Sequence, residues 1–322
     1  MKSLITKSYP FLKLAKWLTR NTPKIMMYHS FSGAEKEGYV SKAHFEWQLQ
    51  TIKKNCVPMS LIDLAELNEN KKPIPKNVVV ITIDDGYKNV FDYAFPLLKK
   101  YQIPATFFVT TNFIDQTDWL WPDKVKYLLS NTQTQETHIE FDGTKTELNF
   151  GAINHLCLNL ENDKKLKFIE HLANQLDITL PVGPPDEFAS CTWQQLEEMQ
   201  RNGIEIGSHT LSHPSLGQVS DKQANTEIEH SLAVINNHLS TIPRTFCYPN
   251  GQPNDYNPNV IKMVGAAGYK AAVTAFPDKH VLTKNFAWRR YSGAGDEIHF
   301  NKAIHGVEMI EQQIKRKVIC DY

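Results

Sequence analysis

Short apolar runs alternate with amphipathic stretches along most of this 322-residue chain, and this alternation restricts the fold more than any other feature. Each run is rich in Val, Ile, Phe or Tyr, which is typical of strands buried on both faces of a parallel sheet. Amphipathic stretches such as 45–54 and 90–101 separate the runs. The pattern predicts an α/β fold, and its repetition favours a barrel. The predicted strands are 24–28, 78–83, 105–110, 204–208, 245–248 and 269–274.

Residues from about 113 to 190 interrupt the alternation. Asp142-Gly143 lies between alternating flanks and predicts a two-residue hairpin turn. A helical stretch over 164–176 and a Pro/Gly-rich loop follow. We interpret this region as an inserted hairpin and helix on one face of a barrel domain that spans 23–322.

The composition excludes several classes of protein. Hydrophobic residues make up 41% of the chain and aromatic residues 11%, which excludes a disordered or fibrous protein. The 35 basic residues balance the 35 acidic ones, which argues against nucleic-acid binding. The five cysteines are scattered and form no Cys-x-x-Cys pair, so we expect reduced thiols of a cytosolic protein and no disulfides or zinc ribbon.

Residues 1–22 predict a basic amphipathic helix. Lys13 and Lys16 interrupt its apolar residues, so we expect neither an export signal nor a spanning helix of roughly 18 apolar residues. The protein is therefore expected in the cytoplasm. The predicted helix within residues 1–22 has two interpretations. Its apolar face packs on the barrel, or the same face lies on anionic lipid at the cytoplasmic side of the inner membrane. The face comprises Phe11, Leu14, Ala15 and Leu18, with Trp17 at its edge and Lys13, Lys16 and Arg20 opposite.

Two acidic residues follow the second predicted strand. VVVITIDDGY places Asp84 and Asp85 at its carboxyl end, before Gly86. Enzymes with barrel folds carry their chemistry at this end of the strands, and a turn at Gly86 can bring both carboxylates toward one mouth. The alternative is a simple turn in which Asp84 caps a helix.

Two histidines, His209 and His213, follow the fourth predicted strand. Their spacing of four places both imidazoles on one face of a helical turn, which suits two ligands of one metal ion. Pro214 limits any helix here to a short turn. The alternative is a pair of surface or capping histidines. With a carboxylate, the two imidazoles would form a three-ligand set that leaves positions for water, and a second carboxylate could take the proton of that water.

Together the two motifs resemble those of the NodB-type polysaccharide deacetylases, carbohydrate esterase family 4. The family's T-F-D-D-G is similar to 82–86, and its H-[ST]-x-x-H is similar to 209–213. Tyr28-His29 resembles the opening strand of the biofilm-polysaccharide branch. The resemblance covers about 24–112 and 190–300 and implies a distorted (β/α) barrel of the NodB-homology type.

The resemblance also implies roles for individual residues. It assigns one divalent metal ion, zinc, to Asp85, His209 and His213, and the role of general base to Asp84. Zinc would lower the pKa of bound water to about 7 and polarise the amide carbonyl. The backbone N–H of Asn250, after the proline of the third motif, would be a donor to the oxyanion.

Two departures from the family pattern concern the base and the acid. The family often has an arginine, which orients the catalytic aspartate, where this chain has Cys247. We expect Arg290 to replace it; the alternatives are Arg289, or two surface arginines. The family's C-terminal histidine, its general acid, has no clear counterpart, because His305 is expected on a helix away from the site.

The expected function is metal-dependent hydrolysis of an N-acetyl or related acyl group on an amino sugar, in a polysaccharide or a lipid-linked glycan precursor. One alternative is a carbohydrate-binding protein of the same fold with little or no turnover. Another is a deacylase of an O-acetyl ester, a formamide or a non-sugar amide, since the same ligand set activates water for each. Trp119 and Trp121, at the start of the insertion, either stack on sugar rings or belong to the core. The sequence leaves the oligomeric state open.

Overall fold

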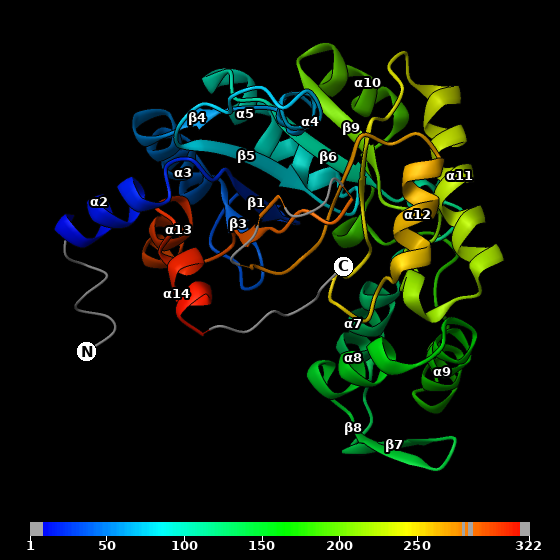
Figure 1. The fold of residues 1–322 in the computed structure, drawn as a ribbon. Helices are drawn as coiled ribbons and strands as arrows, with labels where there is room; N and C mark the ends of the chain where they lie inside the picture. The colour runs from blue at the N-terminus through cyan, green and yellow to red at the C-terminus, as the bar shows by residue number, and fades with distance from the viewer. Residues whose placement is uncertain (1–8, 279–280, 283–285, 316–322) are drawn as a thin grey trace.

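A curved sheet of eight strands forms the centre of the molecule (Figure 1), in a computed structural model that describes residues 9–278, 281–282 and 286–315. The strands are β1 (Lys24–Tyr28), β4 (Val57–Pro58), β5 (Val78–Ile83), β6 (Ala105–Val109), β9 (Ile204–Ser208), β10 (Thr245–Cys247), β11 (Ala271–Val273) and β12 (Tyr291–Ser292). Their order is β11-β10-β9-β6-β5-β1-β12, with β4 added beside β5. Each of these pairings is parallel.

The apolar runs became strands because both faces of the sheet are covered. Every residue of β5 and of β6 is buried, which explains their unbroken apolar sequence. The predicted strands are confirmed, although β6, β10 and β11 are shorter than the runs that predicted them. The α/β prediction is therefore correct.

The segment after β11 joins the two edges of the sheet. Trp288 forms a parallel bridge with Val273 of β11, and two hydrogen bonds extend this contact. A few residues later, Tyr291 pairs with Met26 of β1. The segment thus closes a distorted (β/α) barrel and carries Arg289 and Arg290 between its contact with β11 and its pairing with β1.

Helices cover the outside of the barrel and begin where the sequence supplies caps. The side chains of Ser41, Ser60 and Ser220, for example, accept hydrogen bonds from the first turns of the helices that follow them. The helices are α3 (Lys42–Asn55), α4 (Leu61–Glu69), α5 (Phe95–Tyr101), α6 (Thr111–Ile114), α10 (Trp193–Arg201), α11 (Asp221–His238), α12 (Pro258–Ala266), α13 (Glu297–Ile304) and α14 (Val307–Lys315). A π-helical turn, Val90–Ala94, precedes α5, and a small sheet pairs β2 (Phe31–Ser32) with β3 (Val40–Ser41).

The insertion forms a group of elements to one side of the barrel (Figure 1). It contains α7 (Trp121–Asn131), β7 (His138–Phe141), β8 (Thr144–Glu147), α8 (Phe150–Asn159) and α9 (Asn162–Gln175). Asp142 and Gly143 both have positive φ, as the predicted hairpin turn requires. Helices α7 and α8 were not predicted. The insertion has its own buried cluster, which includes Val125, Leu128, Ile153 and Phe168.

Helix α2 (Tyr9–Leu18) precedes β1 and packs against α13 and α14. Within the described residues, none of the helices combines the length and apolar character needed to cross a bilayer.

Candidate active site

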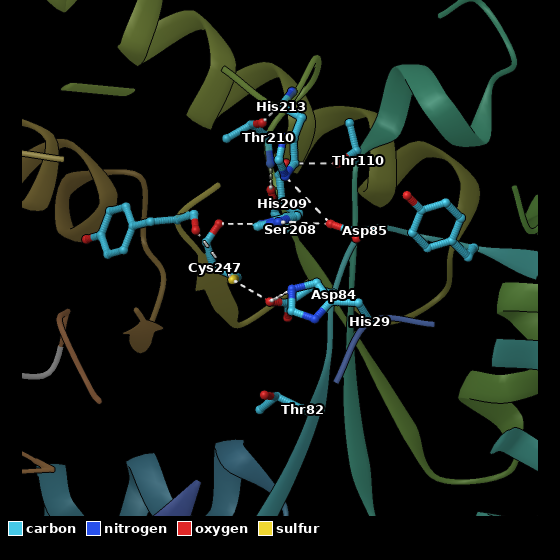
Figure 2. A network of polar contacts seen from close by, with 12 residues as sticks. His29, Thr82, Asp84, Asp85, Thr110, Ser208, His209, Thr210, His213 and Cys247 are labelled. Carbon is cyan, nitrogen blue, oxygen red and sulfur yellow. Dashed lines mark hydrogen bonds and ion pairs between the residues drawn. The ribbon is translucent and has the colours of Figure 1, made fainter. Parts of the chain in front are cut away.

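Four predicted site residues, Asp84, Asp85, His209 and His213, meet at the carboxyl ends of the parallel strands (Figure 2). Asp84 and Asp85 follow β5, His209 follows β9, and His29 follows β1. Because the carboxyl ends of parallel strands share one edge of a sheet, residues far apart in the chain gather there. They line a cavity of about 180 Å³, whose walls are His29, Asp84, Asp85, Pro122, His209, His213, Tyr248, Asn250, Ala275 and Arg290.

Asp85, His209 and His213 form a compact group that could hold a metal ion. Their ligand atoms lie within 4.8 Å of one another, and the Nε2 atoms of both histidines are 3.6 Å from Oδ1 of Asp85. The Nδ1 atom of His209 is 2.8 Å from the carbonyl oxygen of Cys247. Since a carbonyl can only accept, Nδ1 carries a proton, and Nε2 is the nitrogen that could bind a metal. One carboxylate and two imidazoles are a donor set that suits zinc.

A second group, Asp84, His209 and Cys247, also has its potential ligand atoms close together. Both carboxylate oxygens of Asp84 are, however, hydrogen-bonded to Arg290. The group of Asp85 and the two histidines is therefore the better candidate for a metal site.

The two histidines do not lie on a helical turn, so this part of the prediction is wrong. Residues 209–213 form an irregular loop in which Thr210 and His213 have φ values of 69° and 59°. Buried Glu227, on α11, holds the loop by accepting hydrogen bonds from the backbone N–H groups of Leu211 and Ser212, at 2.9 and 3.0 Å. The left-handed conformations are unfavourable for residues with side chains, and these hydrogen bonds stabilise them. Glu227 carried no signal in the sequence beyond its position on a helix.

The surroundings of the group set the protonation state of each candidate ligand. Burial alone would raise the pKa of Asp85, but its hydrogen bond with His209 and the nearby histidines hold it well below its ordinary value. Burial, reinforced by the neighbouring His209, lowers the pKa of His213 to about 3. Burial by itself would lower the pKa of His209, but Cys247 and the carboxylates of Asp85 and Asp84 raise it well above its ordinary value. At neutral pH the metal-free group therefore contains a carboxylate, a neutral His213 imidazole and a protonated His209, and a metal ion would have to displace the proton from Nε2 of His209.

Asp84 is held by Arg290 in a bidentate ion pair. Nη1 and Nη2 of Arg290 donate to the two carboxylate oxygens at 2.7 and 2.6 Å, and both side chains are buried. Arg290 also donates to the carbonyl of Thr274 at 2.6 Å, to the hydroxyl of Thr82 at 2.9 Å and to the sulfur of Cys247 at 3.1 Å. Burial by itself would raise the pKa of Asp84, but the charge and hydrogen bonds of Arg290 lower it.

Arg289 points elsewhere. Its Nη1 donates to the hydroxyl of Tyr256 at 2.7 Å, and its guanidinium lies 4.3 Å from the centre of the Phe276 ring. Both arginines are buried, so the alternative of two surface arginines is wrong. The structure places Arg290, and not Arg289, against Asp84.

Asn250 follows β10 at the rim of the cavity, as the third motif suggested. Its φ of 57° is left-handed, and the N–H of Gly251 bonds back to Pro249 at 2.6 Å. This sharp turn leaves Asn250 among the cavity-lining residues, where its backbone N–H is a candidate oxyanion donor.

His29 is an ionisable cavity residue for which no role was predicted. Its Nε2 lies 3.8 Å from Oδ2 of Asp84, and 47% of its side chain is exposed. The signal that could have found it is its position directly after a buried strand, the same position that drew attention to Asp84. His305, by contrast, ends α13, and its ring is hydrogen-bonded to the carbonyl of Asn301 at 2.8 Å. It is not among the cavity-lining residues, in agreement with the sequence analysis.

The insertion reaches the cavity through the start of α7. Tyr87 donates a hydrogen bond to the buried carboxylate of Asp123, which ties α7 to the end of β5 and places Pro122 in the cavity wall. Trp119 and Trp121 are only 3% and 4% exposed, so the interpretation that they stack on sugars is wrong and their place in the core is confirmed.

Comparisons with known proteins agree with this geometry. A family model described as polysaccharide deacetylase matches residues 71–272. The Bacillus subtilis protein YxkH is 24% identical over 267 residues, which cover 81% of this chain and 68% of that protein. A poly-beta-1,6-N-acetyl-D-glucosamine N-deacetylase of Staphylococcus epidermidis is 38% identical over 81 residues, but the match covers only 25% of this chain and 28% of that enzyme.

A solved structure shares the fold. The Streptococcus pyogenes deacetylase PplD, determined in complex with acetate, superimposes with a TM-score of 0.57 at 20% sequence identity. The superposition covers 84% of this chain and 91% of that one.

Proposed function

Because this chain belongs to the polysaccharide deacetylase family and is a hydrolase of carbon–nitrogen bonds other than peptide bonds, we propose that it removes the N-acetyl group from an amino sugar of a glycan. The observation that carries the proposal is the pairing of two adjacent carboxylates in one cavity. Asp85 belongs to a group that can hold a metal ion, whereas Asp84 is bound by Arg290.

A divalent metal ion, zinc in this proposal, would be held by Asp85, His209 and His213, and when bound it would acidify water and polarise the acyl carbonyl. The remaining chemistry belongs to residues of the chain. Asp84, kept ionised by Arg290, accepts a proton from the attacking water. The backbone N–H of Asn250 donates to the oxyanion that develops on the acyl oxygen.

His29 is the proposed general acid. Among the described histidines that line the cavity, it is the one outside the metal-binding group, and it lies on the side of Asp84. When the amide C–N bond breaks, the leaving nitrogen needs a proton to depart as an amine. A partly exposed imidazole at the cavity wall can donate that proton and regain one from solvent.

The proposed substrate is a polymer of N-acetylated amino sugars. The name of the staphylococcal relative supports this class, and its short match leaves the linkage open. A lipid-linked glycan, an O-acetyl ester and a formamide are alternative substrates for the same site.

Acetate release tests the proposal. Protein stripped with a chelator and reloaded with Zn²⁺ would be incubated with β-1,6- and β-1,4-linked N-acetylglucosamine oligomers and with O-acetylated xylan. The expected result is metal-dependent acetate release from an N-acetylated oligomer, and its loss in Asp84→Asn. Release from xylan alone would contradict the proposal, as would the absence of release from every substrate by fully metal-loaded protein.

A further inference from the structure

One face of α2 carries three large apolar side chains that the described part of the protein leaves exposed. Leu14 is 54% exposed, Trp17 59% and Leu18 58%. Residues three and four positions apart are neighbours on a helix, so the three side chains form one continuous strip. We call Leu14, Trp17 and Leu18 the α2 strip.

The opposite face of α2 holds the helix on the barrel domain. Ala15 and Thr19 are buried, and the Thr19 hydroxyl donates to the carbonyl of Ala15 at 2.9 Å. The ammonium of Lys24, at the start of β1, donates to the carbonyl of Thr19 at 2.7 Å. Gly306, between α13 and α14, approaches Thr19 so closely that a Cβ atom there would lie 2.1 Å from its hydroxyl oxygen. Packing therefore fixes which side of α2 faces outward.

This arrangement divides the apolar face that the sequence predicted. Ala15 faces the domain, whereas Leu14 and Leu18 belong to the outward strip with Trp17. The interpretation of a docked helix and that of a lipid-binding helix are therefore compatible, since each uses a different side of α2.

Basic residues accompany the strip. Lys13, Lys16 and Arg20 lie on or directly after α2, and residues 1–20 contain no acidic residue. Arg20 stacks on Trp17, with its guanidinium carbon 4.5 Å from the ring centre, and it donates to the Trp17 carbonyl at 2.9 Å. The exposed apolar strip is thus bordered by positive charge.

We propose that the α2 strip binds the surface of a bilayer that contains anionic lipid. An amphipathic helix with basic residues beside Trp and Leu lies in the interface between head groups and acyl chains. The tryptophan suits that interface because its ring is apolar and its N–H is polar. The basic residues match the negative surface and make the attachment sensitive to salt. This inference is independent of the proposed reaction.

The attachment leaves the active-site cavity accessible. Helix α2 leads into the amino end of β1, and the carbonyl of Arg20 accepts a hydrogen bond from Asn77, just before β5, at 2.7 Å. The cavity-lining residues His29, Asp84 and Asp85 follow the carboxyl ends of the same strands. The six residues of β5 span about 20 Å. The active site of bound protein is thus displaced from α2, which favours a long glycan over a sugar joined directly to the lipid.

Vesicle co-sedimentation of the full-length chain tests the proposal. The protein would be mixed with phosphatidylcholine vesicles, with and without phosphatidylglycerol, at low and high salt. We expect binding to the anionic vesicles, release at high salt, and a fall in partitioning of about tenfold or more in Trp17→Ser/Leu18→Ser. The matched control is Val182→Ser/Ile242→Ser, which removes two apolar side chains that are 90% and 63% exposed elsewhere, and it should bind like the wild type.

Circular dichroism and acetate release from a soluble oligomer would show that both double variants are folded. Equal partitioning of wild type and Trp17→Ser/Leu18→Ser would overturn the proposal, as would failure of the wild type to bind anionic vesicles. A third result would also overturn it: the wild type does not bind vesicles but self-associates without lipid, and only Trp17→Ser/Leu18→Ser abolishes this self-association. That result would assign the strip to an interface between copies of the chain.

Discussion

Both carboxylate oxygens of Asp84 accept hydrogen bonds from the guanidinium of Arg290, which lies 206 residues further along the chain. The pair places a permanent cation beside one carboxylate of the Asp84-Asp85 motif and leaves the other to the two histidines. Two adjacent residues of the same type thereby acquire different surroundings, which allows them different roles. In the family pattern an arginine at the position of Cys247 would supply this cation; here the segment that closes the barrel supplies it.

Removal of one imidazole should abolish metal binding. His209→Ala takes away a ligand whose Nε2 is oriented by the hydrogen bond from Nδ1 to the Cys247 carbonyl, so bound metal and acetate release should be lost together. Metal content after desalting is the measurement, and His305→Ala, a histidine outside the cavity, is the control. Stoichiometric metal in His209→Ala/His213→Ala would end the assignment of the site.

The two aspartates should separate catalysis from metal binding. Asp84→Asn should retain metal and lower kcat by roughly 10²–10⁴, the range for a positioned proton-transfer group. Asp85→Asn should instead lose metal, because it removes the carboxylate that both histidines face. If Asp84→Asn loses metal while Asp85→Asn keeps it, the two roles are reversed.

Arg290 should set the acidic limb of the pH profile. Arg290 lowers the pKa of Asp84, so activity that needs the carboxylate persists above that pKa and is lost as the pH falls through it. In Arg290→Met burial remains without the cation, and the acidic limb of kcat/KM should move to higher pH by about 1–3 units. Arg290→Lys should restore part of the shift.

The matching control for this experiment is Arg289→Met, which alters a buried arginine that faces Tyr256 and Phe276. Its acidic limb should stay in place. Because a buried carboxylate left without its partner destabilises a protein by about 3–5 kcal/mol, the profiles should be recorded well below the unfolding temperature of each variant. An unmoved limb in folded Arg290→Met would exclude this role for Arg290.

Replacement of His29 should lower kcat most for substrates whose leaving group must be protonated. His29→Gln should keep its metal and lower kcat on an N-acetylated oligomer by roughly 10²–10⁴. The loss should be much smaller with p-nitrophenyl acetate, whose leaving group departs as a stable anion. Equal losses on both substrates would show that His29 has a structural role and does not act as the acid.

The sequence by itself determined the features that depend on neighbouring residues. Continuous Val- and Ile-rich runs gave the buried strands, because a run of this kind is stable only where both faces of a sheet are covered. Asp142-Gly143 gave the hairpin, since few residue pairs adopt positive φ easily. The Asp84-Asp85 and His209–His213 motifs could likewise be located, because each follows a strand directly and strand ends gather at one edge of the barrel.

Only the tertiary structure decided the features that depend on long-range register and packing. Arg289 and Arg290 are neighbours on one segment, and the pairing of Trp288 with Val273 and of Tyr291 with Met26 turns Arg290 toward Asp84 and Arg289 toward Tyr256. Side chains of successive extended residues point in opposite directions, so a shift of one residue would exchange them. The proximity of His29 to Asp84, the loop held by Glu227 and the outward side of α2 arise in the same way, from contacts between segments that local sequence preferences do not encode.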